Sequence, residues 1–136
     1  MNNGRFSISM HILTLLEKSP NEVLSSDYLA GSININPVLV RKEIINLRKH
    51  GLVASKEGKS GGSYLARPAK EILLSDVYEA VRQNSILGQN KNKPNPKCIV
   101  GKQIDEHLNN LSNEVEDAMI KKLSKTTLAD FSKKFN

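Results

Sequence analysis

The strongest constraint on the fold is a helix in the middle of the chain that ends abruptly in front of extended segments. Val40, Ile44 and Leu47 recur at the spacing i, i+4, i+7, which places them on one face of a helix. Asn36 and Pro37 stand at its start. Asn can cap the first turn, and Pro suits the first helical position because its missing N–H is not needed there. The sequence therefore predicts an amphipathic helix with a well-defined beginning.

The periodicity changes directly after Gly51, which suits the end of this helix. Two short extended segments follow, residues 52–55 and 64–66, around the glycine-rich, charged loop 57–62. Two strands around such a loop predict a β-hairpin.

Two further helices are predicted before the central one. Apolar residues at helical spacing indicate a helix over residues 4–18, and Ser25 or Ser26 can cap a short second helix that Gly31 would end. The tight segment 31–35 separates it from the central helix. Helix, turn, helix and hairpin in this order predict a winged helix-turn-helix, so the expected fold class is mainly α with a small β-hairpin.

Positive charge is concentrated in the same stretch. The 136 residues contain 20 Lys and Arg against 14 Asp and Glu, a formal net charge of +6. Residues 36–67 hold seven of these bases and two of these acids, so this stretch carries +5 and the rest of the chain +1. Such clustering is typical of a surface that contacts a phosphate backbone, and the alternative is an ordinary solvated face of Lys and Arg.

The C-terminal half adds a short helix and a loop before a long helix. Ser75 can cap the short helix, and the polar residues 83–97, with Gly and Pro among them, predict a loop. A long helix is expected over about 96–125 and a final short one over about 127–134. The predicted division is a winged helix-turn-helix domain (1–82), a loop (83–97), and a dimerisation helix with a short C-terminal helix (98–136).

The long helix carries a regular apolar seam. Its apolar residues are separated alternately by four and three positions, which is the 3.5-residue repeat of a coiled coil. They are Ile104, Leu108, Leu111, Val115 and Ala118. A helix of about 30 residues spans ~45 Å, more than one small domain covers, so we expect the seam to pair with a second copy in a homodimer.

Several classes of protein and site are not supported. No nucleophile–base constellation is legible, so we do not expect an enzyme. No apolar run approaches the ~18 residues of a membrane span, and no membrane partner is expected. A single Cys among 136 residues, and a start without an apolar secretory stretch, predict a cytoplasmic protein.

Three stretches resemble one known family. They are Asn46-Leu47-Arg48-Lys49-His50-Gly51-Leu52-Val53-Ala54-Ser55, the Gly61-Gly62 hairpin that ends in Tyr64-Leu65, and Leu74-Ser75-Asp76-Val77-Tyr78-Glu79-Ala80-Val81. In this order they resemble the Rrf-two-type family of bacterial winged-helix transcriptional regulators, and with the long helix the resemblance covers nearly the whole chain. It implies a homodimer that binds a pseudo-palindromic operator in double-stranded DNA, and it favours a repressor.

The resemblance places the central helix in the major groove and the hairpin in the adjacent minor groove. A helix presents its first-turn N–H groups and side chains to DNA. The candidate residues at this base-facing end are Asn34, Asn36, Pro37, Val38, Arg41 and Lys42. Candidates for DNA-backbone contacts are Arg48, Lys49, Lys56, Lys59 and Ser63, with Gly61 and Gly62 letting the hairpin main chain approach the duplex.

The number of cysteines separates this chain from some members of that family. Cluster-binding relatives place three cysteines between the loop and the long helix, whereas this chain has only Cys98. Two thiols per dimer cannot supply four ligands, so we expect no iron–sulfur cluster, and the sequence indicates no other metal or cofactor.

Cys98 admits two interpretations. If Asn95 caps the long helix and Pro96 is its first residue, Cys98 is its third residue, where the helix dipole and nearby lysines favour a reactive thiolate. Family members can use cysteines as oxidant sensors, which makes Cys98 a candidate redox sensor. The alternative is a small buried residue, since free Cys is commonly buried.

Two alternatives for the function remain. One is a winged-helix module for protein–protein assembly, whose basic face binds an acidic partner without DNA. The other is a regulator that responds to a small ligand, with Ile86, Leu87 and the loop as candidates to line its pocket.

Overall fold

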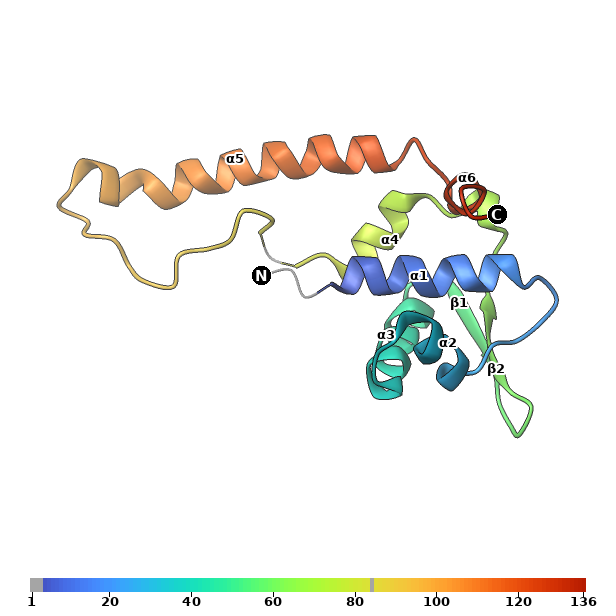
Figure 1. Cartoon of the computed structure of the whole chain (residues 1–136). Helices are drawn as coiled ribbons and strands as arrows, with labels where there is room; N and C mark the ends of the chain where they lie inside the picture. The colour runs from blue at the N-terminus through green and yellow to red at the C-terminus, as the bar shows by residue number, and fades with distance from the viewer. Residues whose placement is uncertain (1–3, 84) are drawn as a thin grey trace.

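The computed structural model describes residues 4–83 and 85–136. Residues 1–3, at the start of the predicted 1–82 domain, and Asn84, in the predicted loop, lie outside the described residues. Within the described residues the chain forms six α-helices, one 3-10 turn and one two-stranded antiparallel sheet (Figure 1). In chain order these are α1 (Arg5–Lys18), α2 (Ser26–Ile33), α3 (Pro37–Lys49), β1 (Val53–Lys56), β2 (Gly62–Leu65), η1 (Ala69–Glu71), α4 (Leu74–Val81), α5 (Ile99–Leu123) and α6 (Leu128–Ser132). The predicted fold class is confirmed: a mainly α winged helix-turn-helix with a small hairpin and a long C-terminal helix.

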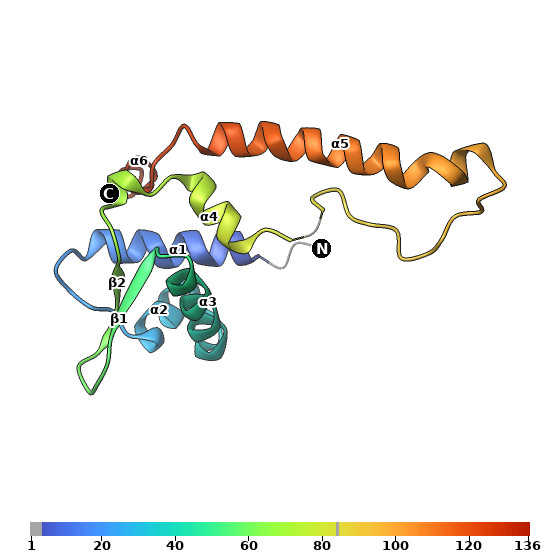
Figure 2. The same ribbon diagram turned by 180° about the vertical axis from the view of Figure 1, so that it is seen from behind.

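Helix α1 lies at the centre of the arrangement. Helices α2 and α3 and the β1–β2 hairpin lie on one side of α1, and α4, α5 and α6 lie on the other (Figures 1 and 2). Helix α5 projects well beyond the other helices, and the chain that leads into it runs beside its outer half. The proposed DNA-reading elements and the proposed dimerisation helix therefore occupy opposite sides of the molecule.

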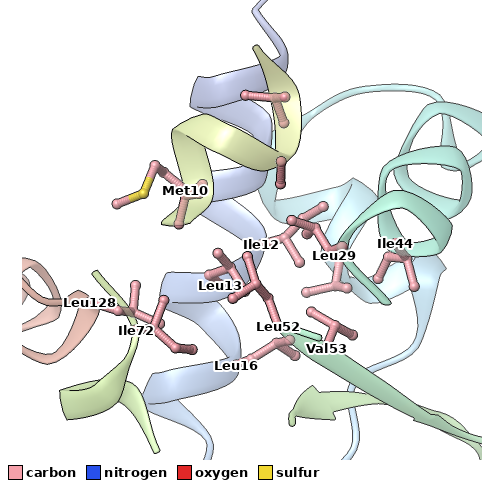
Figure 3. Close-up of a cluster of buried hydrophobic side chains, with 14 of the residues drawn as sticks. Met10, Ile12, Leu13, Leu16, Leu29, Ile44, Leu52, Val53, Ile72 and Leu128 are labelled. Carbon is pink, nitrogen blue, oxygen red and sulfur yellow. The ribbon is translucent and has the colours of Figure 1, made fainter. Parts of the chain in front are cut away.

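The hydrophobic core is built around α1. Ile12 and Leu13 are fully buried, and Leu16 is nearly so, because α1 packs against elements on several sides. They form one cluster with Leu29 of α2 and Leu52, which precedes β1 (Figure 3). This cluster holds both helices of the helix-turn-helix and the base of the hairpin against α1.

The hairpin is anchored near its loop end by a third segment of chain. Strands β1 and β2 pair antiparallel, from Val53 opposite Leu65 to Lys56 opposite Gly62. On the other side of β2, the Ser63 N–H donates to the Leu24 carbonyl at 2.8 Å, and the Leu24 N–H donates back to the Ser63 carbonyl at 3.0 Å. The segment before α2 therefore holds the hairpin in place.

Two predicted helix boundaries are wrong. Gly31 does not end α2, which continues to Ile33; Asn34, with a φ of 64°, supplies the left-handed C-cap instead. Ser75 does not cap α4, because it lies buried inside the helix. The Asp76 carboxylate accepts the Leu73 N–H at 2.9 Å and so stabilises the start of α4 from within.

Helix α5 begins at Ile99, later than predicted. The Asn95 side chain accepts the Lys97 N–H at 2.9 Å, and its carbonyl accepts the Cys98 N–H at 3.1 Å. These bonds close a turn before the helix. The prediction that Asn95 caps α5 and that Cys98 is its third residue is wrong, because Cys98 is itself the N-cap.

The final helix α6 packs on α1 and η1. Leu128 is fully buried beside Ile72 (Figure 3), and its N–H donates to the Ile72 carbonyl at 2.8 Å. The Ser132 hydroxyl donates to the Glu17 carboxylate of α1. Residues 124–127 therefore lead the chain from α5 back to the core.

Candidate nucleic-acid interface

The first turn of α3 begins the candidate interface. Asn36 is the N-cap and its Oδ1 accepts the Val38 N–H at 2.9 Å, which confirms the predicted capping role. Pro37 is the first helical residue, and Val38 is 57% exposed. Asn34, in the turn before the helix, is also exposed. The N-terminal end of α3 is therefore open to a ligand.

One face of α3 points to solvent along its length, opposite the face on which Val40, Ile44 and Leu47 are buried. The exposed side chains are Val38, Leu39, Arg41, Lys42, Ile45, Arg48 and Lys49. All four bases predicted on this helix thus lie at the surface on a single rigid element.

Glu43, the acid of α3, lies on the buried side. Its two carboxylate oxygens accept the Arg5 Nε–H and Nη2–H, both at 3.0 Å. The Asn46 amide donates to Glu43 at 3.2 Å and to the Ala80 carbonyl of α4 at 2.7 Å. The hydrogen bond with Glu43 also raises the pKa of Arg5. This network ties α3 to α1 and α4, and it removes a negative charge from the exposed basic face.

The hairpin brings further bases to the same side of α1 (Figure 1). Lys56 at the end of β1 and Lys59 in the loop are both exposed. Ser63 is only 4% exposed, because it lies against Leu24, and we therefore remove it from the candidate contacts.

The two hairpin glycines have reasons within the chain itself. A Cβ on Gly61 would lie 2.1 Å from the Lys56 carbonyl oxygen, and a Cβ on Gly62 would lie 2.6 Å from the Leu24 carbonyl oxygen. The close approach of the chain to itself gives an internal reason for glycine at both positions, and the approach of this main chain to DNA stays a prediction.

Sequence reasoning missed three exposed apolar residues of the helix-turn-helix. Leu39 (49% exposed) and Ile45 (51%) lie on α3, and Tyr28 (57%) lies in the first turn of α2. The helical spacing of Ile45 from Arg41 and Lys49 could have revealed it, since residues four apart share a face. Apolar side chains next to Lys and Arg side chains on a protein surface suit contacts with the thymine methyl groups and sugars of DNA.

The predicted seam of α5 is largely uncovered within the chain. Leu108, Leu111 and Val115 are 42%, 49% and 40% exposed, Ala118 is exposed, and Ile104 is partly buried. The adjacent face packs on the body through Ser112 and Glu116, which are buried and directly follow the seam residues Leu111 and Val115. The structure therefore leaves the seam partly open to solvent.

Cys98 is exposed, so the alternative of a buried cysteine is wrong. Its N-cap position aims the N–H groups of Gly101 and Val100 at the sulfur, and these hydrogen bonds lower the pKa of the thiol. The direction agrees with the prediction, although the helical position differs.

Comparison with known proteins agrees with this geometry. Residues 2–134 match the Rrf2 family, described as an iron-dependent transcriptional regulator. The chain is 39% identical over 130 residues to YwnA of Bacillus subtilis (strain 168), an inferred HTH-type transcriptional regulator, and the match covers 96% of each protein. It is 35% identical over 81 residues to the HTH-type transcriptional regulator IscR of Cereibacter sphaeroides, covering 59% of this chain and 52% of that relative.

The fold is also similar to that of solved structures. The global cysteine regulator CymR of B. subtilis superposes with a TM-score of 0.73 at 20% identity, over 100% of this chain and 98% of CymR. At this identity the likeness concerns the fold.

The residues present do not fit the iron centre that the family description implies. Among residues 4–83 and 85–136, no group of three or more His, Cys, Asp or Glu side chains could hold a metal ion. The sequence supplies one cysteine, Cys98, which belongs to no such group within the described residues.

In the same described part of the chain, no helix is both long and apolar enough to cross a membrane.

Proposed function

Because the chain belongs to the Rrf2 family of transcriptional regulators, and so is a DNA-binding regulator and not an enzyme, we propose that it acts as a homodimeric repressor. In this proposal α3 and the hairpin of each copy bind one half of a pseudo-palindromic operator. A dimer seated over a promoter would repress by blocking access of the polymerase.

The observation that carries the proposal is the separation of charge on α3. Arg41, Lys42, Arg48 and Lys49 are exposed, while Glu43 is turned inward onto Arg5. A merely solvated helix needs no such separation, whereas a helix that contacts phosphates gains from it. The bases of the hairpin extend the same surface.

The position of each side chain suggests its role. Arg41 or Lys42, near the start of α3, would donate to guanine, and Val38 would contact a thymine methyl group. Asn34, Asn36 and Pro37 would shape the turn that brings the first N–H groups of α3 to the DNA. The contacts with phosphates would come from Arg48, Lys49, Lys56 and Lys59.

The proposed dimer rests on α5. Its 25 residues span ~37 Å, and the seam of Ile104, Leu108, Leu111, Val115 and Ala118 is partly open to solvent. Pairing two seams would cover these apolar side chains. It would also set the distance between two copies of α3, which a pseudo-palindromic operator requires.

Cys98 is the proposed point of a thiol-redox response. It is exposed, and its pKa is lowered by two backbone N–H groups, so the thiolate that oxidants attack is favoured. Treatment of the dimer with a mild oxidant should change operator affinity for the wild type and not for Cys98→Ser. Equal affinities before and after oxidation would refute this part of the proposal.

Selection of bound genomic fragments tests the function directly. The wild type should enrich specific fragments, including the region upstream of its own gene. Arg41→Ala should weaken binding to them by about 1–3 kcal/mol, while Lys70→Ala, an equal charge change on η1, should have little effect. If no fragment binds at 50 mM salt while an acidic protein partner does, the protein–protein alternative is correct.

A further inference from the structure

A cavity of about 420 Å³ lies where α1, α4 and α5 meet. Its apolar walls are Phe6 of α1, Val81 of α4, Met119 of α5, and Ile86 and Leu87 of the segment after α4. Figures 1 and 2 show α4 between α1 and α5, on the side of α1 away from the hairpin. The volume is within the range of pockets that bind small organic molecules. The proposed DNA contacts use none of these residues.

Arg82 is the charged residue among those that line the cavity, and two carboxylates that do not themselves line it, Glu79 and Glu116, hold its guanidinium. The Arg82 guanidinium donates to Glu79 of α4 at 3.1 Å and to Glu116 of α5 at 2.5 Å. The Tyr78 hydroxyl donates to the other Glu116 oxygen at 2.8 Å. One guanidinium between two carboxylates leaves a net charge of −1, so Arg82 is not available as a partner for an anionic ligand.

We propose that this cavity binds a small aromatic molecule that is uncharged or carries a single positive charge. Phe6 and Tyr78 offer rings, and Met119 offers a thioether, which together suit a flat aromatic ligand. A cationic group on the ligand is favoured by the same rings and by the surplus carboxylate. An anionic group of the same size is disfavoured.

The cavity adjoins the bonds that position α3. Phe6 follows Arg5, which is held by Glu43 of α3, and Val81 follows Ala80, whose carbonyl accepts from Asn46 of α3. A ligand that changes the spacing of α1 and α4 would therefore move both attachments of α3. The claim that the ligand alters operator affinity rests on the proposed function. The claim that the cavity binds the ligand does not.

Three naphthalene probes of equal size and different charge test the site by calorimetry on the full chain: 1-naphthalenemethanol, 1-naphthylmethylammonium and 1-naphthoate. The first two should bind once per chain, and naphthoate at least about tenfold more weakly, a difference of about 1.4 kcal/mol. Ile86→Trp should fill the cavity and abolish binding. Ile99→Trp, the same exchange at a position that is 76% exposed at the start of α5, should leave binding unchanged. Glu79→Gln should reduce the difference in affinity between naphthoate and the other two probes, because it removes one carboxylate beside Arg82.

The proposal is overturned if none of the probes binds the folded wild type, if naphthoate binds as well as the alcohol, or if Ile86→Trp binds like the wild type. Operator affinity, measured with and without the alcohol by fluorescence anisotropy, should change at least about threefold in the wild type and Ile99→Trp, and not in Ile86→Trp. Ligand binding without any such change refutes the coupling to α3. Absence of binding to any genomic fragment refutes the proposed function, and the calorimetry then decides on the cavity by itself.

Discussion

Removal of the Glu43 carboxylate should destabilise the chain more than the loss of any surface acid. Glu43→Ala removes the carboxylate that accepts two hydrogen bonds from the Arg5 guanidinium and one from the Asn46 amide. Breaking a buried pair by removing one partner costs about 3–5 kcal/mol. Because the Arg5 side chain is 31% exposed and water can partly replace the carboxylate, we expect about 2–3 kcal/mol.

Urea unfolding at a fixed protein concentration measures this change. With a slope of about 2 kcal/mol per molar urea, the midpoint should fall by about 1–1.5 M. Glu43→Gln, which keeps the shape and one acceptor oxygen, should lose about half as much. Glu57→Ala, an exposed acid in the hairpin loop, should stay within about 0.5 kcal/mol of the wild type. The reasoning is refuted if Glu43→Ala unfolds at the same midpoint as Glu57→Ala.

Three further changes test other parts of the account. Leu111→Glu should weaken the dimer by about 2 kcal/mol or more, because it places a charge in the apolar seam; this is about 30-fold in the dissociation constant measured by sedimentation equilibrium. Asn113→Glu should leave the dissociation constant unchanged. Equal dissociation of both variants would contradict dimerisation through the seam. Burial raises the pKa of Tyr78 to about 12, helped by its hydrogen bond to a carboxylate. Its protonated form therefore stabilises the fold fully below pH 10 and progressively less as the pH rises through 12. In a titration followed by tyrosinate absorbance, the step at highest pH should be absent in Tyr78→Phe. If that step persists in Tyr78→Phe, it belongs to another tyrosine. Gly62→Ala should cost about 1–3 kcal/mol in urea unfolding because its Cβ would meet the carbonyl of residue 24, whereas Gly31→Ala, inside a helix with open space around it, should be neutral or stabilising; similar effects at both glycines would contradict the close approach.

Features that depend on residues close together in the sequence, such as helix starts and apolar spacing, are predictable from the sequence. The start of α3 follows from Asn36 and Pro37, because a cap and a preset φ act within one turn. The seam of α5 follows from its spacing. The end of α2 was missed because a helix tolerates Gly31 when Asn34 can adopt the left-handed cap.

Features that depend on distant contacts were not predictable. Apolar spacing indicates a helix over residues 4–18, but it does not indicate that Leu13 and Ser9 are both fully buried, which happens because α1 is covered on several sides. The pairing of Arg5 with Glu43 joins residues 38 positions apart, and no local pattern indicates it. The burial of Ser63, a predicted DNA contact, was not predictable for the same reason, because it depends on the pairing of Ser63 with the distant Leu24.

The salt dependence of operator binding tests the central claim most directly. Six exposed bases per chain lie on α3 and the hairpin, namely Arg41, Lys42, Arg48, Lys49, Lys56 and Lys59. Arg67, the seventh base of the stretch, is paired with Asp76. A dimer that places Arg48, Lys49, Lys56 and Lys59 of each chain on phosphates makes about eight phosphate contacts, so log K should fall against log salt with a slope of about −7. Lys59→Ala should reduce the steepness by about 2 and Lys70→Ala should not change it; a slope near zero, or one that Lys59→Ala leaves as it was, would contradict the proposed interface.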